Sequence, residues 1–153
     1  TAIQANDLVG RKTARDGGQV ARAIAGRIEA TEAALAQRSS AASKSMLKHL
    51  RAARAAFVEV VDFVAGSTKA SPNAVFAGSV PYLMLAGNVV AGWQMARALI
   101  VAEDQRAEDA AFMDAKVATA RFYAEHILSK VPGVRDSIIE GHAAVNDMAL
   151  EAF

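Results

Sequence analysis

Histidine and glutamate side chains are the residues of this sequence that could build a metal centre in a helical protein. Di-iron bundles use Glu-x-x-His pairs, because residues three apart project from the same face of a helix. Glu125 and His126 are adjacent, and Glu140 and His142 are two apart, so each pair diverges on a helix. His49 is far from both pairs in the sequence. We therefore predict no metal site, and expect each histidine to lie on a helix surface or in a hydrogen bond.

Motifs for phosphate binding or covalent catalysis do not occur in the sequence. It contains no Gly-x-Gly-x-x-Gly, no Walker loop and no Gly-x-Ser-x-Gly. Tyr82 and Trp93 are predicted to be core residues rather than cofactor stackers. Lys116 and Arg121 could reach a phosphate, but cations at the edge of an apolar helix stripe commonly extend into solvent. We predict no catalytic residue in this chain.

The bulk composition is that of one folded domain. The 153 residues are 53% hydrophobic and 22% charged, which excludes a disordered chain. A formal net charge of +1 gives no electrostatic reason to expect nucleic acid or an anionic membrane. The absence of cysteine excludes disulfides and thiolate metal sites, and we expect a cytoplasmic protein. The first residues show no signal peptide and no initiator Met, which points to a cut or processed start.

Apolar residues recur at spacings of three and four along an alanine-rich, proline-poor chain, which predicts an all-α protein. The predicted helices cover 19–37, 40–65, 79–102, 108–129 and 134–151, with a short one near 72–76. Short connections favour an up-down antiparallel bundle of four long helices plus a shorter C-terminal helix. We assign 1–18 to a linker and 19–153 to the bundle.

Side-chain patterns give more detailed expectations for helix ends and core positions. The predicted helix stops are Gly10 and Gly66, and the predicted turn is Asp16–Gly17–Gly18. The inward stripe of the first long helix comprises Val20, Ala21, Ile24, Ala25, Ile28, Thr31 and Leu35, with Glu29 and Glu32 off it. The main stripe of the 108–129 helix comprises Met113, Val117, Ala120, Ala124, Ile127 and Leu128. The anchors of the last helix are Val134, Ile138, Val145, Met148 and Phe153.

The helix over 79–102 belongs to a stretch, 70–96, without a single charged residue. One of its apolar faces comprises Tyr82, Leu85, Val89, Trp93, Ala96 and Ile100. A second comprises Leu83, Ala86, Gly87, Val90 and Gln94. Such a helix lies either inside a larger helical core or across a membrane. Pro81, Asn88 and Gln94 favour the core, so we predict that this helix is near the bundle centre and shielded by its neighbours.

Two stretches resemble a known family. The first is Ser-Val-Pro-Tyr-Leu-Met-Leu-Ala-Gly at 79–87, continuing to Gly-Trp-Gln-Met-Ala-Arg at 92–97. The second is Ala-Thr-Ala-Arg-Phe-Tyr-Ala-Glu-His at 118–126, with Phe112, Lys116, Leu128 and Pro132 around it. Together they resemble the extra C-terminal helical domain of a large-subunit group of bacterial acyl-CoA dehydrogenases, which includes long-acyl and methylmercaptopropionyl-CoA enzymes. The resemblance covers nearly the whole chain.

The start of the chain resembles the segment that follows the catalytic Glu-Gly-Thr of this family. There the glutamate removes the α-proton of an acyl-CoA while the β-hydride passes to FAD, giving a 2-enoyl-CoA. Thr1 and Ala2 match positions near the flavin diphosphate, although Ala2 offers no side-chain hydrogen bond. The resemblance implies that this chain is a piece of a flavoprotein of fatty acid metabolism, without the base, without bound FAD and inactive alone.

The resemblance also implies a structural role. The domain would dock on the missing flavin-binding part of the same chain or at a dimer contact of a homodimeric parent, and a face left apolar would mark the contact. The alternative from another class is a free-standing helical interaction module. A membrane-anchored helix hairpin is the third reading.

Overall fold

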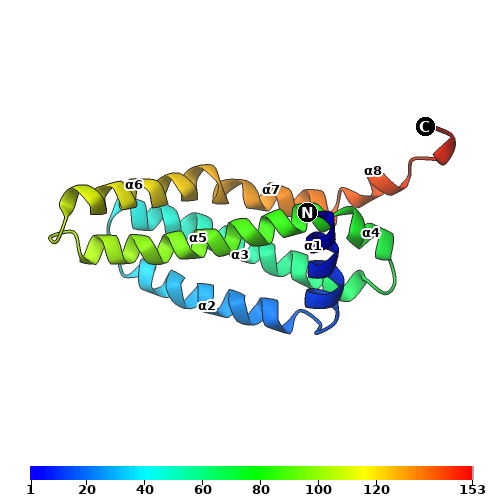
Figure 1. Ribbon diagram of the computed structural model, residues 1–153, viewed down its shortest axis with the longest axis horizontal. Helices are drawn as coiled ribbons and strands as arrows, with labels where there is room; N and C mark the ends of the chain where they lie inside the picture. Colours follow the sequence, from blue (N-terminus) through cyan, green and yellow to red (C-terminus); the bar gives the residue numbers. More distant parts are fainter. Residues whose placement is uncertain (153) are drawn as a thin grey trace.

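Four long helical segments, each antiparallel to the next, form the body of the protein (Figure 1). The structure is a computed structural model and describes residues 1–152, so the predicted anchor Phe153 lies outside the described residues. The four segments are α2 (Gln19–Ala36), α3 (Ala41–Ser67), α5 (Ser79–Asp104) and α6 (Ala110–His126), the last continued by the 3-10 turn η2 (Leu128–Lys130) and α7 (Val131–Ile139). The prediction of an all-α up-down bundle is confirmed.

Shorter helices gather at the end of the bundle where α2 and α5 begin. α1 (Ala2–Asp7) runs directly into the π-helix η1 (Leu8–Ala14) and stands across the bundle axis (Figure 1). α4 (Pro72–Ala77) precedes α5, with Ser71 before the helix and Pro72 in its first turn, as predicted. α8 (His142–Asn146) and the 3-10 turn η3 (Leu150–Ala152) extend beyond this end.

Residues 2–14 form helices that pack on the bundle, which differs from the expected linker. Ala5, Val9 and Thr13 follow one another at intervals of four and are all buried. Gly10 does not end a helix, because the chain passes through it in the wider π-helical turn. Whether a domain boundary lies at residue 18 stays a prediction.

The turn before α2 follows the predicted pattern. Gly17 and Gly18 have φ of 65° and 80°, in the left-handed region that glycine adopts without strain. The Asp16 carboxylate accepts hydrogen bonds from the amides of Val20, at 3.0 Å, and Gly18, at 2.8 Å. The bond from Val20 is the main cause that lowers the pKa of Asp16. Asp16 thereby satisfies amides at the start of α2.

The apolar stripes of α2 and α3 supply much of the core. The fully or nearly buried members include Ala25, Ile28, Leu35, Met46, Leu50, Ala53, Phe57, Val60, Val61 and Val64. Val20 is an exception, since 63% of it is exposed. Gly66 is another departure, because α3 continues through it and ends at Ser67, where the Thr68 hydroxyl donates to the Val64 carbonyl. A side-chain hydrogen bond replaces the expected glycine cap there.

Glu32 is a buried charge that the periodicity placed off the apolar stripe. It is 2% exposed, and its two carboxylate oxygens accept from Arg54 of α3 at 2.7 and 3.0 Å. This bidentate pair joins α2 to α3. A carboxylate can be buried here because a fixed guanidinium meets it, and the stripe pattern of one helix does not report that partner.

α5 is apolar on two faces, and the bundle covers only the first. Tyr82, Leu85 and Val89 are at most 1% exposed and pack into the core with α3 and α6. Among the described helices, α5 is the one long and apolar enough to span a membrane, a test that core helices also pass. Of the second face, Gly87 and Val90 are exposed, so the expected all-round shielding is wrong.

The C-terminal helix is shorter than predicted. α7 ends at Ile139, and α8 begins at His142 after a break at Gly141. A Cβ at Gly141 would lie 2.5 Å from the Ser137 carbonyl oxygen, so the chain turns too tightly there for a continuous helix. Ile138 is buried as predicted. The other predicted anchors beyond the break, Val145 and Met148, are 65% and 56% exposed because they follow the chain off the bundle.

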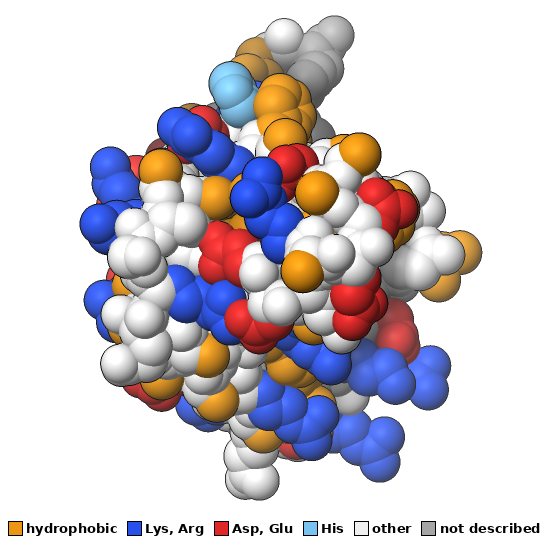
Figure 2. Space-filling model, turned by 90° about the vertical axis from the view of Figure 1, so that its left-hand side faces the viewer, with side chains coloured by type: hydrophobic (Ala, Val, Ile, Leu, Met, Phe, Trp, Pro, Cys, Tyr) orange, Lys and Arg blue, Asp and Glu red, His pale blue; other side chains and the backbone are white. Residues whose placement is uncertain are grey.

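The opposite end of the bundle is polar. Acidic and basic side chains lie close together on it (Figure 2). Arg38, after α2, pairs with Glu103 at 3.1 Å and with Asp104 at 2.8 Å, both at the end of α5. Ser40, which caps α3, also donates to Glu103. These contacts fix the α2–α3 connection to the last turn of α5.

Glu32→Gln should destabilise the bundle more than Asp62→Asn. Both carboxylates join α2 and α3, but Glu32 is buried whereas Asp62 and its partner Arg22 are exposed. We expect Glu32→Gln to lower the free energy of unfolding by about 2 kcal/mol, below the roughly 3–5 kcal/mol of a fully buried pair, because Arg54 keeps partial solvent contact. Asp62→Asn should cost less than about 1 kcal/mol. Urea unfolding of both variants tests this, and equal losses would contradict it.

Two glycines of α5 should respond oppositely to leucine. A Cβ at Gly92 would lie 2.6 Å from Leu128, which is fully buried, whereas a Cβ at Gly87 meets nothing within 4 Å. Gly92→Leu should therefore lose about 1–3 kcal/mol or more through overpacking. Gly87→Leu should gain about 0.5–1 kcal/mol from higher helix propensity. Thermal unfolding of the two variants gives the comparison, and a stabilised Gly92→Leu would refute the close packing of α5 on η2.

Candidate functional site

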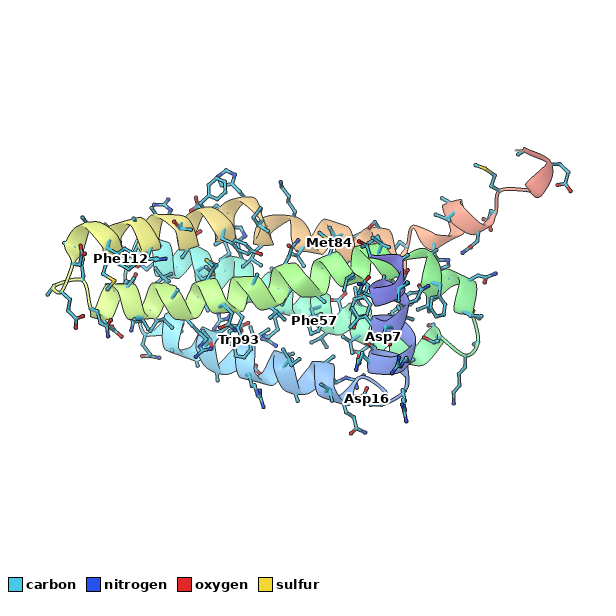
Figure 3. All side chains as sticks on the ribbon, viewed as in Figure 1. Asp7, Asp16, Phe57, Met84, Trp93 and Phe112 are labelled. Atoms are coloured by element: carbon cyan, nitrogen blue, oxygen red, sulfur yellow. The ribbon has the colours of Figure 1, made fainter. Side chains whose placement is uncertain are left out.

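An apolar groove lies where η1, α2 and α5 meet. It encloses about 400 Å³. One wall is formed by Leu8 and Lys12 on η1, and a second by Val20, Ala21 and Ile24 on α2. The third is the second face of α5, with Leu83, Ala86, Gly87 and Val90. In Figure 3, Asp7 and Asp16 mark the α1–η1 side of this region, and Phe57 lies between α2 and α5. We call this feature the η1–α2–α5 groove.

The polar groups at the groove floor are hydrogen-bonded to each other. The hydroxyls of Thr13 and Tyr82 are 2.9 Å apart and share a buried hydrogen bond. The Tyr82 ring stacks on Phe57, with centroids 6.5 Å apart. Burial raises the pKa of Tyr82, so its hydroxyl stays protonated and paired at neutral pH. Neither hydroxyl is placed as a nucleophile or an acid.

The rim of the groove carries one cation. Lys12 lines the groove and also an adjoining hollow formed by Ile3, Asp7 and Leu83. Asp7 is engaged with Arg11 at 3.2 Å. Lys12 has no carboxylate within 4 Å among residues 1–152. Ile3 is 84% exposed, so the adjoining hollow presents one large apolar side chain on α1 to the surface.

A second hollow lies between α5 and α6, at the far end of the bundle. It encloses about 480 Å³ and includes Arg97, Lys116 and Phe112. Lys116 lies 5.0 Å above the Phe112 ring, and Arg97 lies 5.8 Å above the Trp93 ring. This placement agrees with the prediction that Lys116 is a cation at the edge of an apolar helix stripe. The hollow brings together no acid–base pair.

The other residues considered for chemistry have structural partners. Arg121 pairs with Glu125 at 2.8 Å, and the Trp93 indole donates to the Thr31 hydroxyl at 2.8 Å (Figure 3 shows Trp93 beside α2). The three histidines lie on different helices, with His126 stacked on Phe122 and His142 on Phe63. Burial lowers the pKa of His49. In residues 1–152 no three His, Asp or Glu side chains are grouped to hold a metal ion.

Thr1 and Ala2 lie at the start of α1 and are exposed. The Thr1 carbonyl accepts the Ala5 amide at 2.9 Å, and its hydroxyl makes no capping hydrogen bond. Their assignment to the flavin diphosphate stays a prediction.

Sequence reasoning identified the residues of the α5 wall but assigned them to the core. Leu83, Ala86, Gly87 and Val90 were grouped correctly on one face. One signal in the sequence could have marked them as a surface. Helix 79–102 is apolar on two faces, whereas in an up-down bundle the neighbouring helices pack against one of them. The η1 wall is missing from the prediction because residues 1–18 are assigned there to a linker. The α2 wall is missing because Val20, Ala21 and Ile24 are predicted to face the core.

Comparison with known proteins agrees with the sequence resemblance. Residues 22–149 match the family described as "Acetyl-CoA dehydrogenase C-terminal like". The chain is also similar to the 3-methylmercaptopropionyl-CoA dehydrogenase of Ruegeria pomeroyi (strain ATCC 700808 / DSM 15171 / DSS-3), with 43% identity over 148 residues. That match covers 91% of this chain but only 25% of the relative, so the chain spans about a quarter of the relative's length. This all-helical chain, with its open apolar groove, belongs to the acyl-CoA dehydrogenase C-terminal-like family.

Proposed function

We propose that this chain is the C-terminal helical domain of a longer, FAD-dependent acyl-CoA dehydrogenase that oxidises acyl-CoA thioesters to 2-enoyl-CoA. The observation that carries the proposal is the family match over residues 22–149, together with a 43% identical dehydrogenase four times as long as the matched region. The relative's name suggests a 3-methylmercaptopropionyl thioester as one substrate of this class. We propose a cytoplasmic, homodimeric parent.

In this proposal the chain docks and stabilises rather than catalyses. Oxidation of an acyl-CoA needs a base for the α-proton, an acceptor for the β-hydride and a means of holding both against the substrate. The η1–α2–α5 groove offers none of these: its hydroxyls are bonded to each other and its one charged side chain is a lysine. It offers apolar surface, which suits contact with other protein.

FAD, when bound to the parent, supplies the hydride acceptor. Of the two residues assigned to it here, Thr1 is exposed and its hydroxyl makes no capping bond, so a donor is available to a diphosphate. Ala2 would contribute its backbone alone. The fit is partial, and we assign these residues at most an edge of the cofactor site.

Side-by-side expression of the natural gene product and the 153-residue chain tests the proposal. The natural product should be longer, should show flavin absorbance, and should reduce an artificial electron acceptor when given acyl-CoA. The 153-residue chain should be folded and helical by circular dichroism, yet colourless and without turnover after incubation with FAD.

The outcomes separate the readings. A natural product no longer than this chain would favour a free-standing interaction module. Flavin retained by the folded 153-residue chain would contradict the proposal that this chain docks and does not hold the cofactor. Recovery of the chain only in detergent would favour the membrane hairpin.

A further inference from the structure

We infer that the η1–α2–α5 groove is the seat of a helix from the flavin-binding part of the same polypeptide, packed against the second face of α5. This inference rests on the proposed function and adds to it the surface and the kind of occupant. The groove is open in the described residues and its lining is almost entirely apolar. The hollow that shares Leu8, Lys12 and Leu83 with it includes the exposed Ile3.

The shape of the lining favours a helix as occupant. Ala21 on α2 and Ala86 and Gly87 on α5 are small, so a helix backbone can approach both walls closely. Gly87 lies inside the 26-residue α5, is exposed, and a Cβ on it would meet nothing within 4 Å. Gly26 of α2 has the same surroundings away from the groove, so a missing side chain does not by itself indicate a partner. Gly87 matters because it is part of the groove wall, where the missing side chain allows a partner backbone to lie close to α5.

The position of the groove indicates that the helix bound in it comes from the same polypeptide. About three quarters of the relative's length lies outside the region matched by this chain. The hollow that adjoins the groove includes Ile3, two residues after Thr1, so sequence preceding Thr1 in the proposed parent would join the domain near this surface. Tethering at that point gives a covalently linked helix a high effective concentration at the groove.

Charge argues against a second copy of this chain as the occupant. Lys12 is the one charged residue in the lining and has no carboxylate partner among residues 1–152. A two-fold contact through this groove would place the Lys12 side chains of both copies in one apolar interface without a carboxylate from the lining. A helix that carries a carboxylate toward Lys12 supplies that partner.

The test uses photo-crosslinking in the full-length flavin-containing enzyme. Val90→p-benzoylphenylalanine places the crosslinker in the groove, and Lys48→p-benzoylphenylalanine places it on an exposed position of α3 as a control. Mass spectrometry should map the Val90 crosslinks to a helical segment outside residues 1–153, within one polypeptide, with at most background yield from position 48. Crosslinks to a second copy, or none to protein, would overturn the inference.

A matched pair of glycine variants gives an independent readout. Gly26 of α2 is also mid-helix, exposed and without neighbours within 4 Å, but it does not line the groove. In the 153-residue chain, Gly87→Trp and Gly26→Trp should both fold, with unchanged or higher Tm. In the full-length enzyme Gly87→Trp should lower the Tm relative to Gly26→Trp, because only Gly87 lines the groove. Equal Tm values for the two variants in the full-length enzyme would contradict the inference that a helix binds in the groove.

These results are distinguishable from failure of the proposed function. If the natural product binds flavin and oxidises acyl-CoA but the crosslinks go elsewhere, the dehydrogenase assignment stands and only the groove assignment falls. If the natural product is this chain alone, both fall, and its mass shows that before any crosslink is mapped.

Discussion

Burial of the charge-free middle of α5 is the constraint on which the rest of the structure depends. A helix apolar on two faces gains the most stability in water when both faces meet other apolar surface. α3, α6 and α7 cover the face that carries Tyr82, Leu85 and Val89. The other face lines the η1–α2–α5 groove and is open. The docking site that we infer follows from this imbalance, because an uncovered apolar face is a place where other protein can bind.

Charged pairs hold the bundle around α5 in register. Glu32 and Arg54 tie α2 to α3 along their length, and Arg38 ties the end of α2 to Glu103 at the end of α5. Each pair is wholly or partly removed from solvent, where a guanidinium–carboxylate contact is directional and an unpaired charge would be costly. The C-terminal end of α2 is therefore attached to α5. Near its N-terminal end, the groove separates α2 from the second face of α5.

The α1–η1 helix forms the third side of the groove between α2 and α5. The buried positions Ala5, Val9 and Thr13 attach it to the bundle, and the Thr13–Tyr82 hydrogen bond joins it to α5. The same helix presents Ile3 and Lys12 outward. One short segment thus closes one side of the core and forms one wall of the surface groove, with its polar groups already satisfied at the floor.

The sequence by itself determined the fold class, the four long helices and most of their inward stripes, because helical periodicity and short connections are local properties of the chain. The family followed from the resemblance of two stretches, 79–97 and 112–132, to known proteins. It also showed that α5 has two apolar faces. Only the tertiary structure decided which of them is buried, that Glu32 has a guanidinium to meet it, that residues 2–14 pack as helices, and that the chain after Gly141 leaves the bundle. Each of these features depends on which residues of a neighbouring helix lie opposite a given residue. The spacing of apolar residues along one helix does not contain that information.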